Sequence, residues 1–149
     1  VYLYDVEKKK LINKLTFHQK GVQSMAFSTD GKYLITLGVQ GEDALAVWDI
    51  TTGLVVKSAL IRNYATNQVK VDPFVIQANQ FITVGNDASL TFWRLDLKEQ
   101  QLSFYDVSVP ENLKSVNFLS IEFTPNLPAP ASTYYVVIGA DDGSLIAYD

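Results

Sequence analysis

The stretch HQKGVQSMAFSTDGKYLITLGVQGEDALAVWD, residues 18–49, decides the fold of this 149-residue chain. It contains three short apolar runs with the composition of β-strands, and a fourth run follows the turn signal Thr51-Thr52-Gly53. The Asp30-Gly31 pair between the first two runs suits a tight turn, because glycine adopts a positive φ without strain. Four short runs with short connections predict a four-stranded antiparallel sheet. The expected strands are Val22–Phe27, Lys32–Leu37, Ala44–Ile50 and Leu54–Leu60.

Trp48-Asp49 at the end of this stretch belongs to a series of similar endings along the chain. Each one closes an apolar run, and the aromatic residues of successive endings are 44, 45 and 55 positions apart. A period of about 40–45 residues that ends in Trp-Asp indicates a repeat of four strands, which is the unit of a β-propeller. The endings are Tyr4-Asp5, Trp48-Asp49, Trp93-Arg94 and Tyr148-Asp149.

Two further repeats follow the first one. A proline-rich insert, Pro125–Ser132, accounts for most of the longer last interval, and a helical pattern is suggested only at Glu111–Asn117. Phenylalanines at strand positions are expected in the core, namely Phe27, Phe81, Phe92 and Phe123, whereas Phe74, Tyr64 and Phe104 are expected to be exposed. The strands expected in these repeats are Gln68–Val71, Gln80–Val84, Ser89–Leu95, Leu102–Val107, Phe118–Phe123, Thr133–Ile138 and Ser144–Tyr148.

The phase of the repeats predicts an all-β, partial propeller with an open rather than a closed ring. Residues 7–50, 51–95 and 96–149 each hold one outer strand followed by three inner strands, and residues 1–6 form the last strand of a preceding repeat. Propellers close with roughly four to eight blades, so about three repeats are too few. We therefore expect residues 1–149 to be a segment of one propeller domain, and the absence of an initiator Met agrees with a longer parent chain.

Composition excludes several classes of function. The chain has a net charge of −4, a pI of about 4.9 and no cysteine, so disulfides and thiolate metal sites are impossible and no basic face for nucleic acid is expected. No apolar run approaches the ~20 residues that span a bilayer, and no signal peptide is visible. These properties predict a cytoplasmic protein that binds neither nucleic acid nor membrane.

Three stretches carry a resemblance to a known family. The chain resembles the WD40-repeat β-propellers in residues 18–49, quoted above, in FITVGNDASLTFWR (81–94) and in VVIGADDGSLIAYD (136–149). More narrowly, it is similar to WD-repeat proteins of cilia, flagella and centrioles, in its long blade joints and in TFWRLDL with the spaced outer strand that follows. The resemblance implies a protein-binding scaffold, with the remaining blades and axonemal or microtubule-associated proteins as partners.

The family also implies a buried hydrogen-bonded set of His, Ser or Thr, an acid and Trp that ties the strands of a blade. In the first repeat this set would be His18, Thr36 and Trp48, with Asp43 or its neighbour Glu42 as the acid. A buried indole or imidazole needs such partners, because an unpaired polar group costs roughly 1–3 kcal/mol. The later repeats match only in part, through Thr83, Asp87 and Trp93 in the second and Asp142 and Tyr148 in the third.

Residues with catalytic chemistry are sparse. His18 is the only histidine, and the Asp141-Asp142-Gly143 sequence fits a turn better than a calcium loop, so we expect no catalytic, metal or cofactor site. Lys8-Lys9-Lys10 fits a solvated turn better than a contact with an acidic surface. A signalling or ubiquitin-pathway adaptor is the alternative function, and an enzyme with its site in other blades is a less favoured one.

A partner is expected at the irregular joints, since loops held by a rigid scaffold carry function. These joints are 61–66, 108–114 and 125–132, and the last is stiffened by its prolines. The candidate contact residues are Arg62, Tyr64, Pro110, Pro128 and Pro130.

Overall fold

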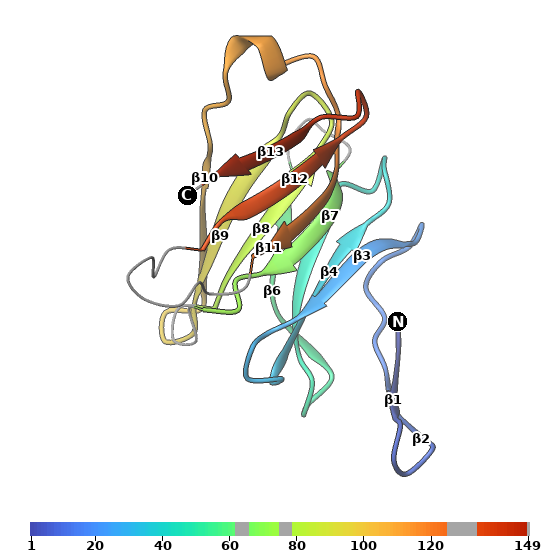
Figure 1. The fold of residues 1–149 in the computed structure, drawn as a ribbon. Coiled ribbons are helices and arrows are strands. Elements are labelled where there is room, and N and C mark those ends of the chain that lie inside the picture. Colours follow the sequence, from blue (N-terminus) through green and yellow to red (C-terminus); the bar gives the residue numbers. More distant parts are fainter. Residues whose placement is uncertain (62–65, 75–78, 125–133, 149) are drawn as a thin grey trace.

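The computed structural model describes residues 1–61, 66–74, 79–124 and 134–148. These residues form thirteen β-strands in antiparallel sheets, with one turn of 3-10 helix (Figure 1). The N-terminal hairpin contains β1 (Tyr2–Asp5) and β2 (Lys10–Lys14), and the first sheet contains β3 (Val22–Phe27), β4 (Tyr33–Gly38), β5 (Ala44–Asp49) and β6 (Leu54–Leu60). The second sheet contains β7 (Thr66–Val71), β8 (Gln80–Gly85), β9 (Leu90–Asp96) and β10 (Gln101–Asp106), and the third contains β11 (Phe118–Phe123), β12 (Val136–Ala140) and β13 (Leu145–Tyr148), preceded by the 3-10 turn η1 (Glu111–Leu113).

Local turn chemistry sets the register of each sheet. In the first sheet the Asp30 carboxylate accepts from the Ser28 hydroxyl over 2.7 Å and from the Lys32 N–H over 3.0 Å. Gly31 has a φ of +70° in this turn. The resulting register pairs Phe27 with Leu34, so the two side chains lie on the same face of the sheet.

The sheets stack side by side, and their first strands, β3, β7 and β11, lie next to one another (Figure 1). A hydrogen bond from a backbone N–H to a side-chain oxygen joins each neighbouring pair of these strands. The Val69 N–H donates to Ser24 Oγ over 3.2 Å, and the Ile121 N–H donates to Gln68 Oε1 over 2.7 Å. Ser24 and Gln68 both lie just after the register shift in their strand. Equivalent positions of the two repeats therefore make the same kind of contact.

Two hydrophobic cores fill the joints between sheets. Ile35, Leu45 and Val47 of the first sheet pack with Phe81 and Trp93 of the second. A second core, which includes Ile82, Phe118 and Ile138, joins the second and third sheets. Burial of apolar area at roughly 25 cal/mol per Å² makes these joints the main source of cohesion between sheets.

A buried carboxylate further connects the three sheets. Asp72, which is 4% exposed, accepts from the Tyr134 hydroxyl over 2.9 Å, and its backbone carbonyl accepts from the Thr29 hydroxyl over 3.3 Å. Burial, and then the bond to Asp72, raises the pKa of Tyr134. The turns of all three sheets are thereby held at one end of the stack.

The expected strands occur, with shifts of a few residues at their ends. The helical pattern at Glu111–Asn117 is only the turn η1, and β12 begins at Val136, with Thr133 outside the described residues. The sheets form no closed ring within the described residues, as expected (Figure 1). No helix in this described part of the chain is long and apolar enough to cross a membrane.

The prediction that Phe27 lies in the core is wrong, since its side chain is 52% exposed. Phe27 lies on the face of the first sheet that turns toward the N-terminal hairpin. The hairpin covers the middle of that face through Leu15, which packs with Leu34 and Trp48, and it leaves β3 open. Phe81 and Phe123 are buried and Phe104 is 59% exposed, as expected, whereas Phe74 packs partly against the second core.

Candidate functional site

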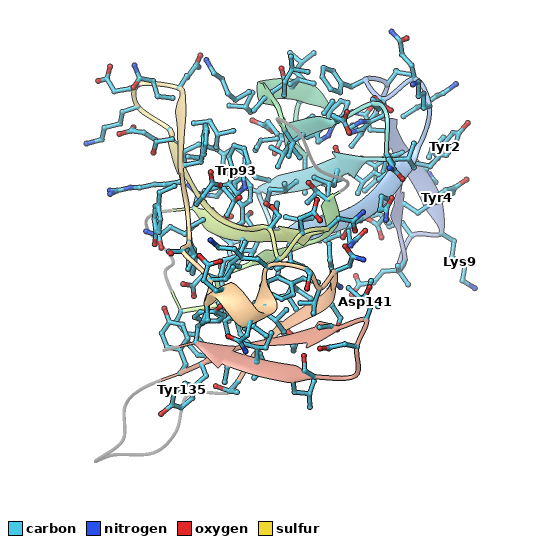
Figure 2. All side chains as sticks on the ribbon, turned by 90° about the horizontal axis from the view of Figure 1, so that it is seen from above. Tyr2, Tyr4, Lys9, Trp93, Tyr135 and Asp141 are labelled. Carbon is cyan, nitrogen blue, oxygen red and sulfur yellow. The ribbon has the colours of Figure 1, made fainter. Side chains whose placement is uncertain are left out.

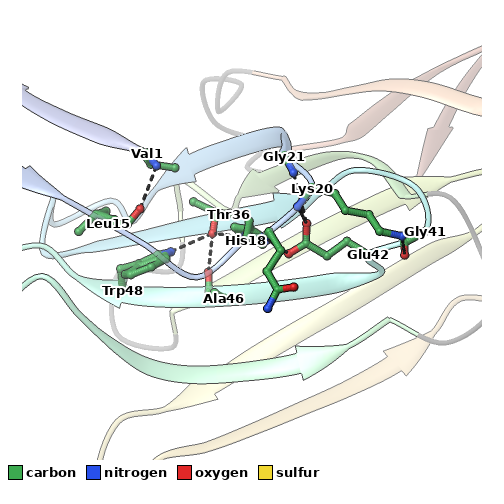
Figure 3. A network of polar contacts seen from close by, with 11 residues as sticks. Val1, Leu15, His18, Lys20, Gly21, Thr36, Gly41, Glu42, Ala46 and Trp48 are labelled. Atoms are coloured by element: carbon green, nitrogen blue, oxygen red, sulfur yellow. Dashed lines mark hydrogen bonds and ion pairs between the residues drawn. The ribbon is translucent and has the colours of Figure 1, made fainter.

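A chain of hydrogen bonds runs through the first sheet from Trp48 to Glu42 (Figure 3). The Trp48 indole N–H donates to Thr36 Oγ1 over 2.8 Å, and Thr36 Oγ1 lies 2.8 Å from Nε2 of His18. Nδ1 of His18 lies 3.0 Å from Oε1 of Glu42. A carboxylate only accepts, so the Nδ1–H of His18 donates to Glu42, and a neutral imidazole then accepts from the Thr36 hydroxyl at Nε2. Each of these polar groups is satisfied by the next, with Thr36 fully buried.

Glu42, rather than Asp43, provides the acid of this set. Its carboxylate also accepts from three consecutive backbone N–H groups, those of Gln19, Lys20 and Gly21, over 3.1–3.4 Å. Burial acts to raise the pKa of Glu42, but the bonds from Lys20, Gln19, His18 and Gly21 outweigh it and lower the pKa. The side chain of Asp43 instead accepts from the Gly41 N–H in the turn.

The set is shorter in the later sheets. Trp93 donates to Thr83 Oγ1 over 2.9 Å, as Trp48 does to Thr36. Asp87 is exposed and engages Asn117 only through its backbone N–H. In the third sheet Asp141 binds the Asn117 side chain over 2.7 Å, while Asp142 accepts from Ser144 in the turn. The resemblance therefore placed both Thr–Trp pairs, whereas of the acids that it offered only Glu42, the alternative to Asp43, joins such a set.

The arrangement around His18 suits a structural tie better than catalysis. Both ring nitrogens are used in internal bonds, and the side chain is 3% exposed. Among the described residues there is no group of three or more His, Asp or Glu side chains that could hold a metal ion.

A cavity of about 960 Å³ lies at the joint between the first and second sheets. Its apolar wall includes Leu60 and Ile61 at the end of β6, with Trp93 and Phe104 from the second sheet. Trp93 lies between the yellow strands of the second sheet and the teal strands of the first (Figure 2). The cavity volume falls in the range of pockets that hold small molecules or side chains of a partner.

Polar side chains of the second sheet and of the segment after it also line the cavity. The Thr91 hydroxyl donates to Oδ1 of Asp106 over 2.7 Å, which fixes this carboxylate on the wall. Asp87 and Lys114 also line the cavity, and Lys114 is paired with Glu111. The cavity is thus lined by large apolar side chains together with two carboxylates, those of Asp87 and Asp106.

One predicted contact residue lies near this cavity. Pro110 is exposed and precedes η1, and its neighbours Ser108 and Val109 line the cavity together with Lys114. Arg62, Tyr64, Pro128 and Pro130 lie outside the described residues. Sequence reasoning missed the cavity, and the available signal was the pair of large apolar residues, Leu60 and Phe104, on outer strands.

Lys8 and Lys9 lie in the exposed turn of the N-terminal hairpin, and Lys10 begins β2. Lys8 lies 3.7 Å from the carboxylate of Asp5, and Lys9 points away from the sheets, as do Tyr2 and Tyr4 (Figure 2). These positions agree with a solvated turn.

Several known proteins are similar in sequence to this chain. The chain is 30% identical over 109 residues to the cilia- and flagella-associated protein 52 of Chlamydomonas reinhardtii, which covers 73% of this chain and 17% of that protein. It is 30% identical over 123 residues to the WD repeat-containing protein 90 of Mus musculus, covering 81% of this chain and 6% of that protein. It is 26% identical over 125 residues to the centriole proteome protein 16 of C. reinhardtii, covering 82% of this chain and 6% of that protein.

The chain therefore spans less than a fifth of the length of these relatives. No family model matches the sequence. The fold resembles the β-propeller domain of Cps50 (Swd1) from Myceliophteria thermophila, with a TM-score of 0.74 and 22% identity, over 98% of this chain and 43% of that domain. The relatives and the shared fold together identify the chain as a member of the WD-repeat β-propeller proteins.

Proposed function

We propose that this chain is a protein–protein interaction scaffold in a cytoskeletal or axonemal assembly. One observation carries the proposal: relatives that match 73% and 82% of the chain are named for cilia and flagella and for the centriole. We further propose that residues 7–50, 51–95 and 96–149 are repeats of one propeller domain, whose other blades are the nearest partners of this chain.

The geometry supports a binding role over a catalytic one. Side-chain ties between β3, β7 and β11, and the buried Asp72–Tyr134 bond, hold the sheets in fixed relative positions. A rigid stack presents its loops and its cavity at low entropic cost of binding. His18 is engaged on both ring nitrogens, which leaves it no free base for catalysis.

Localisation of the full-length protein, fused to a fluorescent protein in ciliated cells, tests the proposal. A structural scaffold remains with the axoneme or centriole after detergent extraction, because its partners are permanent. Fluorescence recovery after photobleaching separates it from a signalling or ubiquitin-pathway adaptor, whose partners exchange. A protein that is lost on extraction, or whose fluorescence recovers fully within seconds, would contradict the scaffold role.

A further inference from the structure

The cavity between the first and second sheets exposes large apolar side chains at its mouth. Leu60 is 77% exposed and Phe104 is 59% exposed, and the Phe104 ring packs on the Trp93 ring at a centroid distance of 5.0 Å. A large apolar side chain inserted here would remove apolar surface of Leu60 and Phe104 from water. Exposed apolar surface next to a concavity is typical of an interaction site.

The strand that carries Phe104 is also an open edge. β10 is the outermost strand of the second sheet, and the Val107 N–H after it donates to the Leu90 carbonyl over 2.9 Å. Along an antiparallel pair, every second residue bonds to the neighbouring strand and the residues between them face the other way. Val107 bonds to β9, so the backbone N–H and C=O groups of Phe104 and Asp106 point away from β9. Such an edge accepts an extended peptide as an added strand.

The charge beside this edge is negative. Asp106 lies on the same face of β10 as Phe104, two positions along the strand, and only Oδ1 accepts from Thr91. The carboxylate of Asp87 has no hydrogen-bond or ion-pair partner among the described residues. Lys114, which is the cation among the described residues that line the cavity, is paired with Glu111. A basic side chain on the bound segment would therefore find two available carboxylates.

We infer that the cavity and the free edge of β10 bind an extended segment of a partner protein, which carries a large apolar residue and, two positions away, a lysine or arginine. On an added strand, residues i and i+2 point to the same face, as Phe104 and Asp106 do on β10. The apolar residue then fills the cavity over Trp93 while the basic residue reaches Asp106 and Asp87. The inference rests on the proposed scaffold function and names the chemistry of one partner.

Short fluorescein-labelled peptides provide the test, measured by fluorescence anisotropy with the full-length protein. The peptides share a Ser/Thr background and differ at the centre, which is Leu-Thr-Arg, the reversed Arg-Thr-Leu, or either of these with Arg replaced by Glu or with Leu replaced by Ser. The first two represent the two possible strand directions, and one of them binds best. Replacing Arg by Glu weakens binding by about fivefold, as for exposed ion pairs, and replacing Leu by Ser weakens it by about tenfold.

Two variants on β6 locate the binding site. Leu60→Glu introduces charge at the mouth of the cavity and weakens binding at least about tenfold, the scale of an interface hot spot. Leu54→Glu is the matched control, because Leu54 is 68% exposed on the same strand and does not line the cavity. Equal effects of the two substitutions overturn the inference, as does the absence of any preference for Leu over Ser.

A charge reversal tests the basic position independently of Leu60. Asp106→Lys reverses the preference, so that in the better-binding strand direction the peptide with Glu binds the variant better than the peptide with Arg does. Glu99→Gln, at the far end of the β9–β10 hairpin, leaves both affinities unchanged. An Asp106→Lys variant that keeps its preference for Arg contradicts the inference, even if Leu60→Glu fails to fold.

Failure of this inference is distinguishable from failure of the scaffold function. A protein that remains in the axoneme but binds none of the peptides retains the scaffold role and loses the cavity as its contact. A protein that binds Leu-Thr-Arg or Arg-Thr-Leu with the stated variant effects, but is absent from cilia and centrioles, retains the cavity site and loses the axonemal role.

Discussion

Trp48 donates its indole N–H to Thr36 across neighbouring strands, at 2.8 Å and with both side chains at most 2% exposed. The second sheet repeats this pair as Trp93 and Thr83, at 2.9 Å. The difference between the sheets is His18, whose Nε2 lies 2.8 Å from the Thr36 hydroxyl oxygen and makes no such contact with Thr83. One hydroxyl therefore serves two buried groups in the first sheet and one in the second.

Thr36→Val is expected to destabilise the chain more than Thr83→Val. Valine keeps the shape but leaves both Trp48 Nε1 and His18 Nε2 unpaired, at a cost of about 2–4 kcal/mol, against about 1–2 kcal/mol for the single unpaired group at Trp93. The free energy of unfolding in urea measures both substitutions. Equal losses would show that the bond to His18 contributes no stability.

Glu42 is expected to make stability fall in acid. The pKa of Glu42 is below its ordinary value of 4.5, so the folded state binds this proton less tightly than the unfolded chain does. Its contribution is fully present above about pH 5 and is lost as the pH falls below 4.5 through the lower folded-state pKa. In Glu42→Gln, unfolding in urea at a series of pH values shows a shallower decline in this window.

Glu7→Gln is the control for this acid effect, because Glu7 is an exposed carboxyl of the N-terminal hairpin turn. Its decline should match that of the unchanged protein. A Glu42→Gln variant with the same acid decline as Glu7→Gln would contradict the assigned role of the three backbone N–H groups.

Gly53→Ala is expected to cost more stability than Gly31→Ala. The two glycines have nearly the same φ, +72° and +70°, so the strain of a left-handed alanine, about 1 kcal/mol, is common to both. An added Cβ at Gly53 would overlap the Asn13 side chain of β2, whereas the one at Gly31 would meet no atom within 4 Å. Thermal unfolding of both variants measures the difference.

If the Asn13 side chain causes this difference, removing that side chain abolishes the difference. In an Asn13→Ala background, Gly53→Ala and Gly31→Ala should have the same cost. A difference that persists in this background would assign the effect to the backbone of the turn instead of the contact with the hairpin.

Met25→Lys together with Phe27→Lys is expected to reduce self-association of the 149-residue chain. Met25 and Phe27 are 50% and 52% exposed on one face of β3, and apolar faces of this kind promote association. Sedimentation velocity measures the shift toward monomer. Leu54→Lys, on the outer strand β6, is the control, and an equal shift there would argue against β3 as the associating face.

Much of the strand pattern could be predicted, because it depends on neighbours in sequence. Val22–Phe27 and Phe118–Phe123 match β3 and β11 at both ends, since apolar runs bounded by turn residues leave few alternatives. The 3-10 turn at Glu111–Leu113 shows the limit of this reasoning. Three residues are too few for the spacing of apolar residues to distinguish a single turn from a longer helix.

The amino-acid sequence by itself determined the strands, their turns and the four-strand period, because these depend on neighbours in sequence. The pairing of Thr36 with Trp48 was implied by the resemblance to the WD40-repeat family. Tertiary structure decided which acid reaches His18, because Glu42 and Asp43 are adjacent and only the path of the turn at 39–43 selects between them. It also decided that Phe27 is exposed and that Leu60 and Phe104 border one cavity. These properties depend on how one sheet packs on another, and the alternation of residues along a strand contains no information about the neighbouring sheet.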